Sequence, residues 1–115
     1  MNATIRNILV LMGVLAISTN ANASMNQNIV RYGYENVGGV EIFYREAGNP
    51  DNPAIVLLHG FPSSSHMYRE VLAALSDDYY LIAPDYPGFG NSSFPSIKEY
   101  TYTFDNIAKT MNTFL

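Results

Sequence analysis

Two short apolar runs, residues 54–58 and 79–83, give the first predicted elements. Each run is followed at once by a loop that contains Gly and Pro, and the segment between the runs carries apolar residues at helical spacing. Uninterrupted apolar runs of this length are typical of strands buried on both faces, as in a parallel sheet covered by helices. The pattern therefore predicts a right-handed strand–helix–strand unit whose two loops lie at the carboxyl ends of the strands.

A β-hairpin is predicted before this unit, from residues 29–35 and 40–46. The paired glycines Gly38 and Gly39 lie between these two β-rich runs, and paired glycines at such a place are a hairpin signal. Side chains in the second run alternate, with Val40, Ile42 and Tyr44 on one face and Glu41, Phe43 and Arg45 on the other. This alternation fits an antiparallel pair at the edge of the sheet, with one face more exposed.

Two helices are predicted from apolar periodicity. The first runs from about residue 66 to 75, after three serines that are N-cap candidates, and its shared face carries Tyr68, Val71, Leu72 and Leu75. The second begins after Thr103 as N-cap, and its apolar positions are Phe104, Ile107, Ala108, Met111, Phe114 and Leu115.

The first 23 residues have the layout of a secretory signal peptide. One positive residue, Arg6, precedes an apolar run at 8–17, and small residues end the segment at Ala23. Cleavage after Ala23 would leave residues 24–115, a chain of 115 − 23 = 92 residues that is secreted or periplasmic. The apolar run is shorter than the roughly 20 residues that a spanning helix needs, so we expect no stable membrane anchor; an uncleaved anchor is the alternative.

The charge and residue content of the chain limit the classes of partner and cofactor that we expect it to bind. The formal net charge is −4 and no basic residues cluster, which disfavours a nucleic-acid or anionic-membrane partner. The chain has no Cys, and its two histidines, His59 and His66, lack the spacing of a helical metal-binding pair. We therefore expect no cofactor and no metal, and a small-molecule substrate for the complete protein.

The loop after the first apolar run reads His-Gly-Phe-Pro and suits a site that stabilises negative charge. Preorganised backbone N–H groups stabilise an oxyanion, each by about 3–4 kcal/mol. Gly60 would let the backbone turn sharply and approach a ligand closely, while Pro62 fixes φ and cannot compete as a donor. The alternative is a structural turn in an unrelated strand–helix–strand protein.

The loop after the second apolar run, residues 85–92, begins with Asp85 and contains Gly88 and Gly90. The two glycines permit backbone angles that other residues resist, but the loop lacks the Lys and the spacing of a phosphate-binding loop. Ser92 is not in a nucleophile elbow, because no second Gly follows it at the required position. Asp85 has nothing to orient as a catalytic acid, so we expect a structural role.

The two loops, in this order and each at the end of an apolar run, resemble the α/β-hydrolase superfamily over roughly residues 30–115. Within it they look most like the branch of epoxide hydrolases and haloalkane dehalogenases. The resemblance implies an oxyanion donor at the Phe61 backbone N–H and a cis bond between Phe61 and Pro62. It also implies that His59 is structural, its ring hydrogen-bonding neighbouring loops, with a pairing to Asp85 as the hypothesis.

No G-x-S-x-G motif, nor its equivalent with Asp at the centre, occurs in the chain. In the family the nucleophile follows the second helix and one more strand, so the resemblance implies an N-terminal portion of the fold, truncated before the nucleophile. The predicted function is the N-terminal fragment of a secreted hydrolase acting on a small ester, epoxide or haloalkane-type substrate, inactive alone. The alternative is a non-catalytic short protein that acts as a binding or interaction module.

The same topology predicts that apolar surface of the isolated chain would be exposed. The strand at 54–58 would be left as a bare apolar edge, and the apolar face of the second helix would be exposed. We therefore expect the isolated polypeptide to be marginally stable or prone to aggregate.

Overall fold

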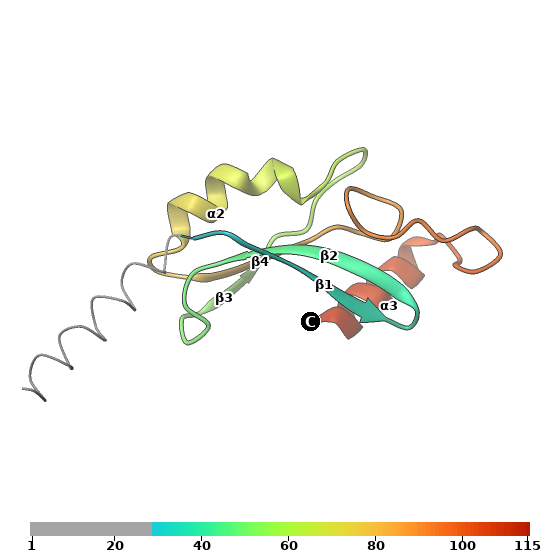
Figure 1. Ribbon diagram of the computed structural model, residues 1–115, viewed down its shortest axis with the longest axis horizontal. Helices are drawn as coiled ribbons and strands as arrows, with labels where there is room; N and C mark the ends of the chain where they lie inside the picture. Colours follow the sequence, from blue (N-terminus) through green and yellow to red (C-terminus); the bar gives the residue numbers. More distant parts are fainter. Residues whose placement is uncertain (1–28) are drawn as a thin grey trace, which may run out of the picture.

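The computed structural model describes residues 29–115, so the predicted signal peptide at 1–23 and its cleavage site lie outside the described residues. Four strands form one mixed sheet in the order β1-β2-β4-β3 (Figure 1). These are β1 (Arg31–Val37), β2 (Val40–Ala47), β3 (Ala54–Val56) and β4 (Tyr80–Pro84). Strand β2 is antiparallel to both β1 and β4, whereas β3 is parallel to β4, as the strand–helix–strand prediction requires.

The predicted hairpin is confirmed. Gly38 and Gly39 form a two-residue turn with φ of +59° and +87°, a conformation that L side chains resist and that suits the twist of a hairpin. From Val37 opposite Val40 to Arg31 opposite Glu46, the register of the pair runs without a bulge.

Helices cover opposite faces of the sheet (Figure 1). A 3₁₀ turn, η1 (Ser65–Tyr68), leads into α2 (Arg69–Leu75) on one face, and α3 (Phe104–Phe114) lies on the other. The α2 side is closed by a core of Ala47, Leu72 and Leu81, against which Val30, Ile55, Leu57, Tyr68 and Val71 pack. The α3 side is closed by Val40, Ile42, Tyr100 and Met111, with Val37, Tyr86, Tyr102, Ile107 and Phe114 against them. The result is the predicted α/β class with an incomplete sheet.

The first predicted helix is confirmed in position, but its first turn is tighter than expected. Ser64 is the N-cap, and its side chain accepts a hydrogen bond from the His66 N–H. Leu75 is predicted on the buried face and is instead 36% exposed, so α2 packs through its first turn, at Val71 and Leu72.

The prediction for the second helix is right about its N-cap and wrong about its exposure. The Thr103 side chain accepts from the Asn106 N–H, as a cap does. The apolar face is not left open, because Met111 is buried and Ile107 and Phe114 pack against the hairpin. In contrast to these three residues, Phe104 at the start of the helix is almost fully exposed, at 94%.

Strand β3 differs from the prediction of burial on both faces. Ile55 in the strand and Leu57 just after it pack beneath α2. Val56 and Leu58, which point to the opposite face, are 37% and 48% exposed. Within the part of the chain that the structure describes, β3 pairs only with β4, so its outer edge is bare, as predicted.

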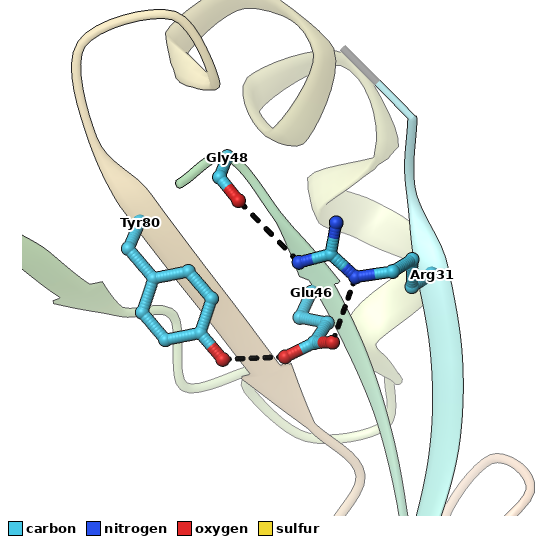
Figure 2. A network of polar contacts seen from close by, with 4 residues as sticks. All are labelled: Arg31, Glu46, Gly48 and Tyr80. Atoms are coloured by element: carbon cyan, nitrogen blue, oxygen red, sulfur yellow. Dashed lines mark hydrogen bonds and ion pairs between the residues drawn. The ribbon is translucent and has the colours of Figure 1, made fainter. Parts of the chain in front are cut away.

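A polar network joins three adjacent strands of the sheet (Figure 2). The Glu46 carboxylate accepts from Arg31 Nε at 2.9 Å and from the Tyr80 hydroxyl, and Arg31 also reaches the Gly48 carbonyl at 3.4 Å. Burial and the Glu46 hydrogen bond raise the pKa of Tyr80 to about 12. Burial opposes ionisation of Glu46, but the hydrogen bonds from Tyr80 and Arg31 and the Arg31 charge outweigh it and lower the pKa of that carboxyl. The network therefore joins β1, β2 and β4.

Candidate active site

The two Gly-containing loops meet at the carboxyl ends of β3 and β4, and His59 joins them. Its Nε2 accepts a hydrogen bond from the Tyr86 backbone N–H at 3.1 Å, which leaves the ring proton on Nδ1 to be donated to the Gly60 carbonyl at 2.8 Å. The ring is 3% exposed and stacks on Tyr86 with centroids 4.0 Å apart. Both ring nitrogens are occupied by backbone groups, so the structural role predicted for His59 is supported by its contacts.

Asp85 holds the loops by different bonds from those expected. Its Oδ1 accepts from the Ser65 N–H at 2.6 Å and its Oδ2 from the Asn91 N–H at 2.9 Å, and the side chain is fully buried. The hypothesis of a direct pairing with His59 is wrong. The carboxylate instead accepts from one backbone donor in its own loop and from the buried Ser65 donor at the start of η1, which would otherwise be buried unpaired.

The Asp85 carboxylate leaves no space for a side chain at position 90, so this position requires glycine. Its φ is +51°, and a Cβ built on it would lie 2.0 Å from Asp85 Oδ2. Gly88 has φ +83°, with the Tyr102 ring 3.0 Å from a built Cβ. Both positions therefore need glycine, the first for space and the second for backbone conformation.

Gly60 does not have the positive φ that a sharp glycine turn would give, which corrects that part of the prediction. No heavy atom lies within 4 Å of a Cβ built on it, apart from its chain neighbours. The backbone beside Phe61 is therefore open to the approach of another molecule.

Phe61 is the candidate donor. The bond from Phe61 to Pro62 is cis, as the resemblance implied. Among residues 29–115, no hydrogen bond uses the Phe61 backbone N–H. The Phe61 side chain is 86% exposed and touches Phe89 edge-on, with ring centroids 5.9 Å apart. An unpaired backbone donor thus lies in open space at the end of β3.

Three hydroxyls, two in the loop after β4 and one in η1, fix this arrangement, and the sequence did not reveal their roles. Ser92 donates from Oγ to the Asp85 carbonyl at 2.7 Å and accepts from the Phe43 N–H at 2.9 Å. Ser93 Oγ accepts from the Glu41 N–H at 3.0 Å, so the two serines satisfy β2 where it extends past β4. Tyr68 donates from its hydroxyl to the Leu58 carbonyl at 2.5 Å. The D-x-x-G-x-G-x-S pattern, which begins at Asp85 and ends at Ser92, was the available signal.

Tyr86 and His66 are titratable residues in and beside the two loops. Burial, with a smaller contribution from neighbouring Tyr68, raises the pKa of the Tyr86 phenol. His66 lies at the start of η1 and is exposed.

Within residues 29–115 no three His, Cys, Asp or Glu side chains gather closely enough to hold a metal ion. No helix in those residues is long and apolar enough to span a bilayer.

A sheet with helices on both faces, and two Gly-containing loops at the carboxyl ends of adjacent parallel strands, defines an α/β fold. Proteins of this class generally bind ligands at those ends. The family model for the alpha/beta hydrolase fold matches residues 53–115, more than half of the chain. The chain belongs to the α/β-hydrolase family.

Its relatives include haloalkane dehalogenases and epoxide hydrolases. A haloalkane dehalogenase of Bradyrhizobium diazoefficiens is 39% identical over 77 residues, which cover 67% of this chain and 24% of that protein. Epoxide hydrolase A of Mycobacterium tuberculosis is 42% identical over 62 residues, covering 53% of this chain and 19% of the relative. The crystal structure of the haloalkane dehalogenase DbeA from Bradyrhizobium elkani superposes with a TM-score of 0.69 at 30% identity, over 75% of this chain and 28% of that one. The chain spans about a quarter of the length of the curated relatives it matches.

Proposed function

We propose that the chain is the N-terminal part of a secreted hydrolase acting on a small ester, epoxide or haloalkane-type substrate. The Phe61 backbone N–H is one donor of its oxyanion hole, and the nucleophile, acid and base come from chain outside this sequence. One observation carries the proposal: the Phe61 N–H is unpaired beside open space, whereas His59 and Asp85 are occupied in holding the loops.

The same donor serves either nucleophile. A Ser nucleophile that attacks an ester carbonyl creates a tetrahedral oxyanion directly. An Asp nucleophile that opens an epoxide or displaces a halide first forms an enzyme ester, and water attack on that ester creates the oxyanion one step later. In both routes the donor acts on negative charge that develops on a carbonyl oxygen, which is where a backbone N–H contributes most.

The first test is the locus beyond the codon for Leu115. We expect the reading frame, in this locus or an intact homologous one, to continue into a strand and G-x-[S or D]-x-G, and the complete polypeptide to hydrolyse a member of an ester, epoxide and haloalkane panel. A Ser at the centre would favour ester hydrolysis, and an Asp would favour epoxide or haloalkane chemistry. A complete polypeptide without such a nucleophile, or without activity on all three substrate classes, would refute the proposal.

The second test isolates the Phe61 N–H in that complete polypeptide. Replacing Phe61 by phenyllactic acid through nonsense suppression keeps the ring and exchanges the N–H for an ester oxygen. We expect kcat to fall by about 10²–10³-fold with little change in KM, the effect of losing one oxyanion donor. The matched control is phenyllactic acid at Phe89, whose N–H donates to the Tyr86 carbonyl at 2.9 Å and closes a turn. Equal losses of kcat at both positions would remove Phe61 from the oxyanion hole.

A further inference from the structure

Among residues 29–115, no strand covers the outer edge of β1. Its neighbour β2 directs the backbone groups of Glu41 and Phe43 away from β1, toward Ser92, Ser93 and Asp85. Because backbone directions alternate along paired strands, residues Arg31, Gly33 and Glu35 face β2, and Tyr32 and Tyr34 direct their N–H and C=O groups outward. Strand β1 pairs with no other strand among the described residues.

This edge lacks several of the devices that usually prevent strand pairing, and its charged residues are Arg31 and Glu35. The strand has no Pro and no Lys, and its register against β2 contains no bulge. Tyr32 and Tyr34 are 63% and 55% exposed, so their side chains are accessible as well as their backbone groups. An exposed strand edge with large side chains is a template for a further strand.

The sequence of β1 is complementary to itself in the antiparallel direction. If two copies pair about Gly33, Arg31 lies opposite the partner's Glu35, and Tyr32 lies opposite the partner's Tyr34. Outward-facing Tyr32 and Tyr34 then exchange both backbone hydrogen bonds, since paired residues of this kind face one another across the new interface. Opposite charges and aromatic pairs at directly opposed positions both stabilise antiparallel strands.

Gly33 of each copy lies at the centre of this pairing. Gly33 has no side chain, and the Tyr44 ring of the same chain occupies the space of a Cβ, 2.5 Å from its built position. Further out, Ile29 lies opposite the partner's Val37, which adds an apolar pair at each end. Glu35 is exposed, and Arg31 is 40% exposed even while bound to Glu46, so both ends of the charge pair remain reachable.

We propose that a second copy of this chain covers the edge of β1, forming a two-fold symmetric dimer with one continuous sheet through β1 of both copies. An antiparallel, two-fold arrangement is the self-complementary one, so the assembly closes at two chains. This inference does not depend on the proposed hydrolase activity.

Two variants of one residue test the backbone bonds, by sedimentation equilibrium of the full 115-residue chain. Tyr34→Pro removes an outward N–H that β2 does not use, so the hairpin bonds remain, and Tyr34→Thr removes the ring but keeps the N–H. We expect a dimer for the wild type, a weaker dimer for Tyr34→Thr and a monomer for Tyr34→Pro, with circular dichroism confirming the fold. Equal dissociation constants for the two variants would overturn the proposal, as would a monomeric wild type.

A charge reversal tests the register. Glu35→Arg places like charges at two symmetric positions, and we expect the dimer dissociation constant to rise about tenfold, from the usual strength of two cross-strand charge pairs. Glu41→Arg makes the same change at an exposed position of β2 and should leave the constant unchanged. Val56→Lys, on the bare edge of β3, should also leave it unchanged. Loss of association in Val56→Lys but not in Glu35→Arg would assign the contact to β3 and overturn the proposal.

Discussion

Replacing Asp85 by Asn tests the claim that this carboxylate holds both loops. The carboxylate is fully buried and accepts from two backbone N–H groups, at 2.6 and 2.9 Å. An Asn of the same shape offers one oxygen, and its NH₂ would face the other backbone N–H. The change removes a charge-assisted hydrogen bond, about 1.5–3 kcal/mol, and leaves a buried donor unpaired, about 1–3 kcal/mol. Since the two contributions overlap, we expect a loss of about 3 kcal/mol in the free energy of unfolding.

The loss is large for a structure of this size. At roughly 0.05–0.15 kcal/mol per residue, a domain of this length is stable by only about 4–13 kcal/mol. Urea denaturation followed by circular dichroism measures the change, with Asp78→Asn as the control because Asp78 is exposed. Hydrogen exchange adds a local measurement: the Ser65 and Asn91 amides should lose protection, whereas the Ile107 amide in α3, which donates to the Thr103 carbonyl at 3.0 Å, should change less. A loss below about 1 kcal/mol, with both loop amides still protected, would refute the role given to Asp85.

Three further predictions concern Gly90, Tyr80 and the leader. Gly90→Ala forces a Cβ against Asp85 Oδ2 at a positive φ and should cost about 3 kcal/mol of unfolding free energy, measured by urea denaturation. Tyr80→Phe should cost about 1 kcal/mol. This difference in unfolding free energy should be full between about pH 5 and 10. The hydrogen bond stops contributing as Tyr80, whose pKa is raised to about 12, ionises at higher pH, and also as Glu46, whose pKa is lowered, is protonated at pH values below the ordinary Glu range. A pH-independent difference would contradict this prediction. For the leader, mass spectrometry of exported protein should find an N-terminus directly after Ala23, and an intact N-terminus would contradict the predicted cleavage.

Features set by neighbours in the chain were predictable from the sequence. The Gly38–Gly39 turn, the Thr103 cap and the parallel pairing of β3 and β4 each follow from a local pattern. The cis bond before Pro62 was predicted from the resemblance of its loop, since a proline alone is seldom enough to indicate it.

Features set by distant contacts were not predictable. An apolar run at 54–58 looks the same whether its strand is central or at an edge, so the exposure of Val56 needed the strand order. The periodicity of α3 indicates an apolar face but not its cover, which is the Val40 and Ile42 face of the hairpin. Motif spacing brings His59 and Asp85 to one end of the sheet, but the choice among nearby backbone donors depends on distances of a few tenths of an ångström, which no sequence pattern encodes.

The strand order also separates the two proposals. Strands β1 and β3 are the opposite margins of the sheet, with β2 and β4 between them. Pairing of a second copy at β1 therefore leaves β3 open for the strand that would carry the nucleophile in a complete hydrolase. The loops that present the Phe61 N–H are tied to β2 through Phe43 and Glu41, on the side of β2 that faces away from β1. A dimer formed through β1 should accordingly leave the candidate oxyanion site unchanged. In the complete polypeptide, Glu35→Arg should weaken association without lowering kcat, whereas removal of the Phe61 N–H should lower kcat without changing the dimer dissociation constant.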